Sequence, residues 1–88
     1  IINLLSKKNK PIILNGGGFG ERFVKICDKN NIKNHNIKIA KDEDINFDLL
    51  SSVEADTFIC NAHETTIGRL YILDKISKFV TKNNLLNI

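Results

Sequence analysis

The sequence predicts an α/β fold built on a parallel sheet, and the order of its apolar segments is the main reason. Short apolar runs that are typical of buried strands alternate with segments in which apolar residues recur at helical spacing. Alternation of this kind is typical of parallel strands joined by right-handed helical crossovers. The chain has 88 residues, of which 42% are hydrophobic, and this suffices for one small domain or for part of a larger one.

The first half of the chain supplies two predicted strands. Residues 1–7 have helical spacing and are expected to form the tail of a helix. Pro11–Asn15 is a continuous apolar run between a proline and an Asn-Gly pair, which fits a strand buried on both faces. Residues 16–20 follow as a glycine-rich turn, and residues 21–30 are predicted to form an amphipathic helix. Residues 36–40 alternate apolar and polar, which predicts a strand nearer the sheet edge.

The middle of the chain continues the same pattern. Residues 42–44 are all acidic and predict a solvated loop. Residues 46–53 are expected to form a short helix with Asn46 as its N-cap, because an asparagine oxygen can accept from the first free backbone amides. Residues 56–61 read as a third strand, and residues 62–68 as a polar loop.

The last quarter contains the clearest helical pattern. Residues 70–82 are predicted to form a helix, and residues 84–88 the start of a fourth strand. The predicted apolar face of the helix consists of Leu70, Leu73, Ile76, Phe79 and Val80. The chain starts on Ile1 rather than Met, so we expect a further segment upstream.

Composition argues against a nucleic-acid or membrane protein. The net charge is only +3, and the one basic cluster (Lys7, Lys8 and Lys10) is interpreted as solvated surface. No apolar run approaches the ~20 residues that a membrane-spanning helix needs. Cys27 and Cys60 lie in apolar surroundings without metal-ligand spacing, so we expect reduced, buried thiols in a cytoplasmic protein.

The glycine-rich turn does not match the known phosphate-binding patterns. A dinucleotide motif counted from Gly16 needs a third glycine where Glu21 stands, and no Gly-Lys-Ser/Thr follows for a P-loop. The negative charge of Glu21 in the first helical turn also disfavours a phosphate there. What remains is one aromatic, Phe19, which either faces a flat ligand or packs into the core. Residue chemistry alone favours the core.

The polar loop at residues 62–68 follows the third strand. Thr65 and Thr66 have a simple structural explanation as N-caps of the helix that follows. Cys60 and His63 are a lone pair of possible ligands without a partner pair, so no metal site is expected. Cys60 falls inside the strand, and no nucleophile arrangement can be argued from this loop.

The two loops together carry a resemblance to a known family. Residues 15–23 resemble the "N-G-x-(aromatic)-G-x-R" turn of class V aminotransferases, with one extra residue before the aromatic. Residues 64–68 are similar to the "E-T/S-T/S-T-G" loop of that family. These are pyridoxal-phosphate enzymes of fold type I and include the alanine–glyoxylate, serine–pyruvate and 2-aminoethylphosphonate–pyruvate transaminases. The resemblance extends over residues 12–88.

The resemblance implies a cofactor, pyridoxal 5′-phosphate, and two residues that contact it. Phe19 takes the place of the aromatic that stacks on the pyridine ring, and Thr65 that of a hydroxyl near the ring. The chain departs from the family at Ile67, where a third hydroxyl is usual, and at Ala62, where a histidine is often found. The Schiff-base lysine, the aspartate that binds the pyridine nitrogen and the main phosphate-binding turn have no counterpart here, so the chain holds no catalytic residue. We expect the aspartate just past Ile88.

The resemblance also implies the setting of the chain. Residues 1–88 are expected to be a single partial domain, the central part of a three-layer, parallel-sheet, cofactor-binding large domain. The intact enzyme would be a homodimer that moves an amino group from 2-aminoethylphosphonate or a small amino acid to a keto acid such as pyruvate, while the fragment alone would be inactive. Two alternatives stay open: a self-contained flavodoxin-like or nucleotide-binding module, and a noncatalytic α/β interaction domain.

Overall fold

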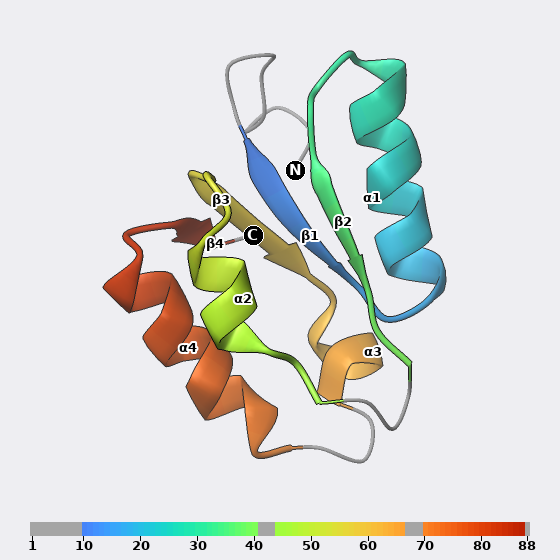
Figure 1. Cartoon of the computed structure of the whole chain (residues 1–88). Helices are drawn as coiled ribbons and strands as arrows, with labels where there is room; N and C mark the ends of the chain where they lie inside the picture. Colours follow the sequence, from blue (N-terminus) through green and yellow to red (C-terminus); the bar gives the residue numbers. More distant parts are fainter. Residues whose placement is uncertain (1–9, 41–43, 67–69, 88) are drawn as a thin grey trace.

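The computed structural model describes residues 10–40, 44–66 and 70–87, and these form a parallel sheet with helices on both faces (Figure 1). The predicted parallel α/β fold is therefore confirmed. The elements in chain order are β1 (Pro11–Asn15), α1 (Gly18–Lys29), β2 (His35–Lys38), α2 (Phe47–Ser51), β3 (Thr57–Cys60), α3 (Ala62–Thr66), α4 (Ile72–Lys82) and β4 (Leu86–Asn87).

The sheet has the strand order β2-β1-β3-β4, so β1 lies between β2 and β3. Ile12 is opposite His35 of β2 and opposite Phe58 of β3, and Thr57 is opposite Leu86 of β4. All five residues of β1 are buried, which confirms the prediction of a strand covered on both faces. The prediction that β2 lies at an edge is also confirmed, because nothing among the described residues pairs with its outer side.

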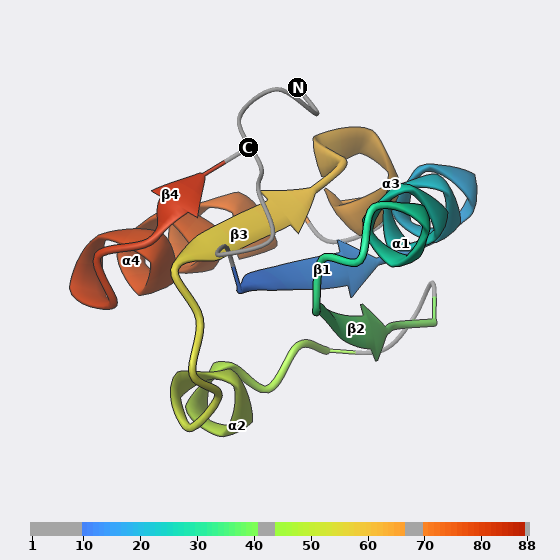
Figure 2. The ribbon, with the colours of Figure 1, turned by 90° about the horizontal axis from the view of Figure 1, so that it is seen from above.

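Two apolar clusters cover the two faces of the sheet. Alternate residues of a strand point to opposite faces, so Ile13 and Ile59 pack on α1 while Ile12 and Phe58 pack on α2 and α4. Figure 2 shows α1 and α2 on opposite sides of the sheet. The cluster under α1 contains Ile13, Cys27, Ile32 and Ile59, and the opposite cluster Ile12, Leu14, Ile45, Leu50, Phe58, Ile72, Ile76 and Phe79.

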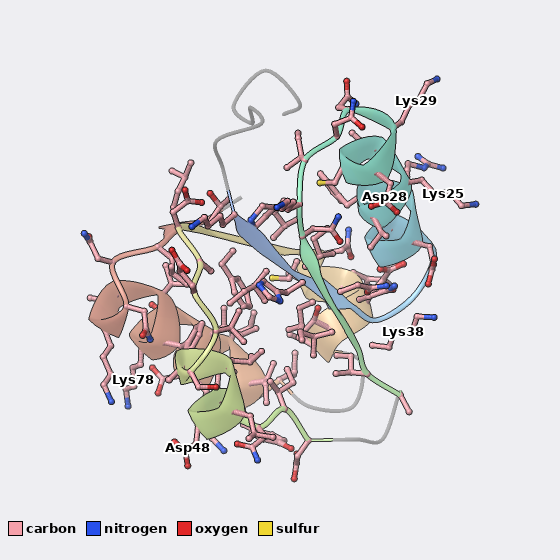
Figure 3. All side chains as sticks on the ribbon, turned by 45° about the horizontal axis from the view of Figure 1, so that its top comes forward. Lys25, Asp28, Lys29, Lys38, Asp48 and Lys78 are labelled. Carbon is pink, nitrogen blue, oxygen red and sulfur yellow. The ribbon has the colours of Figure 1, made fainter. Side chains whose placement is uncertain are left out.

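The predicted polar face of α1 is exposed to solvent. Figure 3 shows Lys25, Asp28 and Lys29 pointing away from the sheet, and all three are exposed. The helix ends at Lys29, and Asn31 just beyond it has a φ of 57°. Asparagine tolerates this left-handed conformation better than most residues, which explains why the helix stops here.

The predicted cap of α2 is confirmed. The Asn46 side-chain oxygen accepts a hydrogen bond from the Leu49 backbone amide at 3.2 Å. The start of α1, however, was predicted three residues too late, because α1 begins at Gly18 rather than at residue 21. Glycine is a poor helix former, and the contact that supports this early start comes from a distant part of the chain.

The predicted apolar face of α4 is partly wrong. Leu70 is 75% exposed and Leu73 is 46% exposed, whereas Ile72, Ile76 and Phe79 are buried. Ile72, Ile76 and Phe79 follow the i, i+4, i+7 spacing of one helical face. The buried face is therefore rotated from the predicted one, and Ile76 and Phe79 belong to both.

Residues 62–66 form the short helix α3 rather than the predicted loop. The fourth strand begins two residues later than predicted, since β4 is Leu86–Asn87. The predictions for residues 1–7, for Asp42 and Glu43, and for the last part of the polar loop lie outside the described residues. Within the part of the chain that the structure describes, no helix has the length and apolar character needed to cross a membrane.

Candidate functional site

The glycine-rich turn and α3 follow neighbouring strands at the carboxyl edge of the sheet. The chain leaves β1 toward β2 and leaves β3 toward β4, so the two connections run in opposite directions. This makes the gap between β1 and β3 the topological switch point, where open α/β sheets bind their ligands. In Figure 1, the α1 start and α3 lie beyond the tips of β1 and β3. The two segments singled out in the sequence thus share one end of the sheet.

Asn15, the last residue of β1, organises the turn from a buried position. Its side-chain oxygen accepts from the Gly17 backbone amide at 3.2 Å, which closes a local turn. Its amide nitrogen donates to the Glu21 carboxylate at 2.8 Å and to the Asn36 side-chain oxygen at 3.1 Å. One buried amide therefore ties the turn to both α1 and β2.

The carboxylate of Glu64 joins the two loops. It accepts from the Phe19 amide at 2.8 Å and from the Gly20 amide at 3.3 Å, although Glu64 and Phe19 are 45 positions apart. The first amides of a helix have no partner within the helix and carry partial positive charge. Gly17, the N-cap residue of α1, supplies no side-chain cap. Glu64 therefore caps α1 from a different part of the chain.

The cap has a consequence for phosphate binding. A phosphate at the start of a helix would use the same free amides that Glu64 engages. The Glu64 carboxylate is also anionic, so it would repel a phosphate group at this position. This contact supports the expectation that the glycine-rich turn binds no nucleotide phosphate.

The glycines of the turn allow close packing between the segments. A Cβ atom on Gly17 would lie 2.9 Å from a Glu64 carboxylate oxygen, and one on Gly16 would lie 3.2 Å from the Glu64 backbone oxygen. A Cβ on Gly20 would lie 2.4 Å from the Asn15 side-chain oxygen. At position 20 the Cβ would also lie 2.6 Å from the Asn15 Cα, and because this atom is backbone the position requires glycine. At position 17 the nearest atom is the end of the flexible Glu64 side chain, so a Cβ there would push on the carboxylate rather than on backbone.

Phe19 projects from the first turn of α1 and is 48% exposed. It belongs to neither apolar cluster, so the interpretation that residue chemistry alone favoured, a core residue, is wrong. The Arg22 guanidinium carbon lies 5.7 Å from the Phe19 ring centroid, in a cation–π arrangement. The exposed ring fits a stacking role, and its contact with a cofactor stays a prediction.

Thr65 is fully buried in α3. Its side chain lies beside Cys60, where a hydrogen bond between the two partly offsets the rise that burial causes in the pKa of the Cys60 thiol. The Thr66 hydroxyl donates to the Ala62 backbone oxygen at 2.5 Å, so neither threonine caps α4. The Thr65 hydroxyl is enclosed by protein in this arrangement. Its predicted contact with a cofactor is untested.

The other charged and sulfur groups of the described residues bear on a possible metal site. No group of three histidine, cysteine, aspartate or glutamate side chains capable of holding a metal ion occurs among the described residues. Cys27 and Cys60 are free thiols; Cys27 is buried as predicted, whereas Cys60 is only half-buried because it ends β3. Burial raises the pKa of both thiols. Lys10 forms an exposed ion pair with Glu54 at 2.5 Å, and the other two lysines of the basic cluster lie outside the described residues.

The structural roles of Asn15 and Glu64 were not predicted from the sequence, although both residues belong to the two motifs. A local signal for α3 did exist, because Asn61 and Glu64 have the spacing of an N-cap residue and its partner at the third helical position. The Asn61 side-chain oxygen does accept from the Glu64 amide at 3.0 Å. The Glu64 side chain, however, turns to α1, and no local pattern indicates that.

The chain matches no protein-family model and no curated protein. The fold and the paired loops therefore carry the functional argument by themselves.

Proposed function

We propose that this chain is part of the cofactor-binding large domain of a pyridoxal-phosphate-dependent aminotransferase of the class V, fold type I kind. In the intact cytoplasmic homodimer it would help to move an amino group from 2-aminoethylphosphonate or a small amino acid to a keto acid such as pyruvate. The fragment itself lacks the Schiff-base lysine and would be inactive alone.

The observation that carries the proposal is the meeting of the two motif segments at the switch point. They are far apart in the sequence, yet the Glu64 carboxylate bonds directly to the amides of Phe19 and Gly20. Loops that follow neighbouring parallel strands lie close together in any sheet of this order, so the support comes from the specific bonds between the Glu64 carboxylate of one motif and the backbone amides of the other. Their position beyond the ends of β1 and β3 is where a parallel sheet of this order holds its ligand.

Phe19 is the residue with which this segment would hold the cofactor. The cofactor supplies an electron sink for the carbanion formed at the α-carbon of the amino donor, and it needs a flat apolar surface against its ring. An exposed phenyl ring provides that surface, and stacking of two aromatic rings is worth about 1 kcal/mol. Arg22 lies over the same ring, so the cofactor would use the side that the guanidinium leaves open.

The nucleotide-binding alternative shares the strand order, because flavodoxin-like sheets also place a ligand between the first and third strands. It is disfavoured by Glu64, which occupies the helix amides that a phosphate would use. Calorimetry of this chain with nucleotides and flavin mononucleotide is expected to show no binding. A noncatalytic interaction domain would instead bind no small molecule, even within the full-length parent protein.

The decisive test is the amino-acid sequence of the parent protein beyond this segment, together with its cofactor content. The proposal expects an aspartate shortly after Ile88, at the end of the strand that β4 begins, and a lysine after a later strand. It also expects the purified parent to retain pyridoxal phosphate, seen as a visible absorbance band. A parent that lacks both residues and binds no pyridoxal phosphate would rule the proposal out.

A further inference from the structure

We infer that Glu64 is a positioning residue for the cofactor, which it serves by fixing the backbone that carries Phe19. This inference rests on the proposed function, because it concerns how the same site presents its aromatic ring. Glu64 itself would not contact the cofactor. It would set where the ring stands.

Packing alone does little to hold Phe19. The ring is 48% exposed and belongs to neither apolar cluster. It is attached to a run of glycines, whose backbones are the least restricted of any residue. A strong bond at the Phe19 amide is therefore well placed to fix the ring, and the 2.8 Å bond to Glu64 is of that kind, since its acceptor is a carboxylate.

Glu64 is itself held firmly from two sides. Its amide donates to the Asn61 side-chain oxygen at 3.0 Å, which anchors the start of α3 directly after β3. Its backbone oxygen and carbonyl carbon lie 3.2 and 3.3 Å from where a Cβ of Gly16 would be, so the turn packs closely on it. The position of β3 is thus transmitted through Glu64 to the first turn of α1.

The chemistry at this position requires a carboxylate. One Glu64 oxygen faces the Phe19 amide and the other faces the Gly20 amide. A glutamine has a single acceptor oxygen, so its NH2 group would face one of these N–H donors. It also loses the negative charge that suits the positive end of a helix. Glu64→Gln is therefore close in shape and defective in function.

The experiment uses the intact parent protein with three variants, Glu64→Gln, Glu64→Ala and the control Glu54→Gln. Glu54 is an exposed glutamate that pairs with Lys10 and has no bond to the turn. The first measurement, made without cofactor, is hydrogen–deuterium exchange of the peptide that spans residues 16–22. Loss of a hydrogen bond to a charged group predicts about tenfold faster exchange in both Glu64 variants, and an unchanged exchange rate in the control.

The second measurement is the affinity for pyridoxal phosphate, together with its bound absorbance spectrum. We expect about fivefold to tenfold weaker binding in both Glu64 variants, a loss of the size of an aromatic contact, and a shifted spectrum. Acetate, which can occupy the space left by the missing carboxylate, is expected to restore part of the affinity of Glu64→Ala but not of Glu64→Gln. Circular dichroism of each variant checks the fold, and the near-isosteric Glu64→Gln decides the matter where Glu64→Ala does not fold.

The outcomes separate this inference from the proposed function. Unchanged exchange at residues 16–22 in Glu64→Gln would overturn the cap and the positioning role together. Faster exchange with unchanged cofactor affinity and spectrum would leave a structural cap and overturn the positioning role. A wild-type parent that binds no pyridoxal phosphate would overturn the proposed function and the positioning role, while the exchange result would still show whether Glu64 fixes the turn.

Discussion

Replacement of Gly20 by alanine tests the packing at the heart of the site. Gly20 lies in the first turn of α1, directly against the end of β1. A Cβ there would lie 2.4 Å from the Asn15 side-chain oxygen and 2.6 Å from the Asn15 Cα. The second atom is backbone, so the clash cannot be relieved by a side-chain rotation. Helix and strand must separate, or the turn must change shape.

The size of the effect follows from two opposing contributions. Adding a methyl group to a closely packed site costs typically about 1–3 kcal/mol. Alanine in place of glycine within a helix gains up to about 1 kcal/mol. The gain is small beside a contact at 2.4 Å, so Gly20→Ala is expected to lower the free energy of unfolding by about 1–2 kcal/mol.

Gly18 supplies a matched control two positions away in the same helical turn. A Cβ there would lie 3.9 Å from the nearest Glu64 oxygen, which is an ordinary contact. Gly18→Ala should therefore leave the free energy of unfolding unchanged or raise it by up to about 1 kcal/mol. Urea denaturation followed by circular dichroism measures both variants. A Gly20→Ala protein as stable as Gly18→Ala would refute the close approach of α1 to β1.

Three further predictions concern the ring, the core and the thiols. In the parent protein, Phe19→Ala should weaken pyridoxal phosphate binding by about 1 kcal/mol or more. Leu49→Ala, which changes a distant exposed side chain, should leave the affinity unchanged. Equal affinities of Phe19→Ala and the wild-type parent would contradict the stacking role. Ile76→Ala should lower the free energy of unfolding by about 2–5 kcal/mol in urea denaturation. Leu73→Ala, on the exposed face of the same helix, should change it by less than about 0.5 kcal/mol. Similar losses in the two variants would contradict the observed buried face of α4. Burial raises the pKa of the Cys27 thiol, so the buried thiol contributes its full stabilisation below the unfolded thiol pKa of about 8.5, and this stabilisation declines as the pH rises through the folded pKa. The urea midpoint should therefore fall at alkaline pH, and it should fall less in Cys27→Ala. An identical pH profile in the two proteins would contradict this.

The positions of the strands, and the burial of β1 on both faces, could be predicted from local sequence patterns. The run Pro11–Asn15 is continuously apolar, and a strand with neighbours on both sides and helices on both faces has this composition. The Asn46 cap was equally readable, because a capping side chain bonds to a backbone amide only three positions away. Both features depend on residues that are close in sequence.

The predictions that were wrong concern features set by contacts between distant parts of the chain. The early start of α1 depends on Glu64, which lies 45 positions from Phe19, so the local glycine run read as a turn. The buried face of α4 is set by the direction in which it meets the sheet, and Leu70 and Leu73 were equally apolar candidates for that face. In each case the deciding contact is long-range, and no local spacing contains it.

The same contrast applies to the site. The two motifs were recognised from the sequence, yet the exposure of their residues was not predicted, because Phe19 is exposed while Thr65 is buried. Exposure of an aromatic depends on what packs over it, which a glycine-rich neighbourhood does not reveal. Asn15 and Glu64, the two side chains that hold the loops in place, act through bonds that only the folded chain brings together.

The most direct test of the central claim follows the cofactor through one cycle of amino transfer in the purified parent. Pyridoxal phosphate is loaded, and 2-aminoethylphosphonate, alanine and serine are added one at a time. One of these donors is expected to change the visible absorbance of the bound cofactor, and pyruvate is then expected to restore it. Failure of the parent to bind pyridoxal phosphate, or a bound cofactor whose absorbance no amino donor alters, would contradict the proposed aminotransferase function.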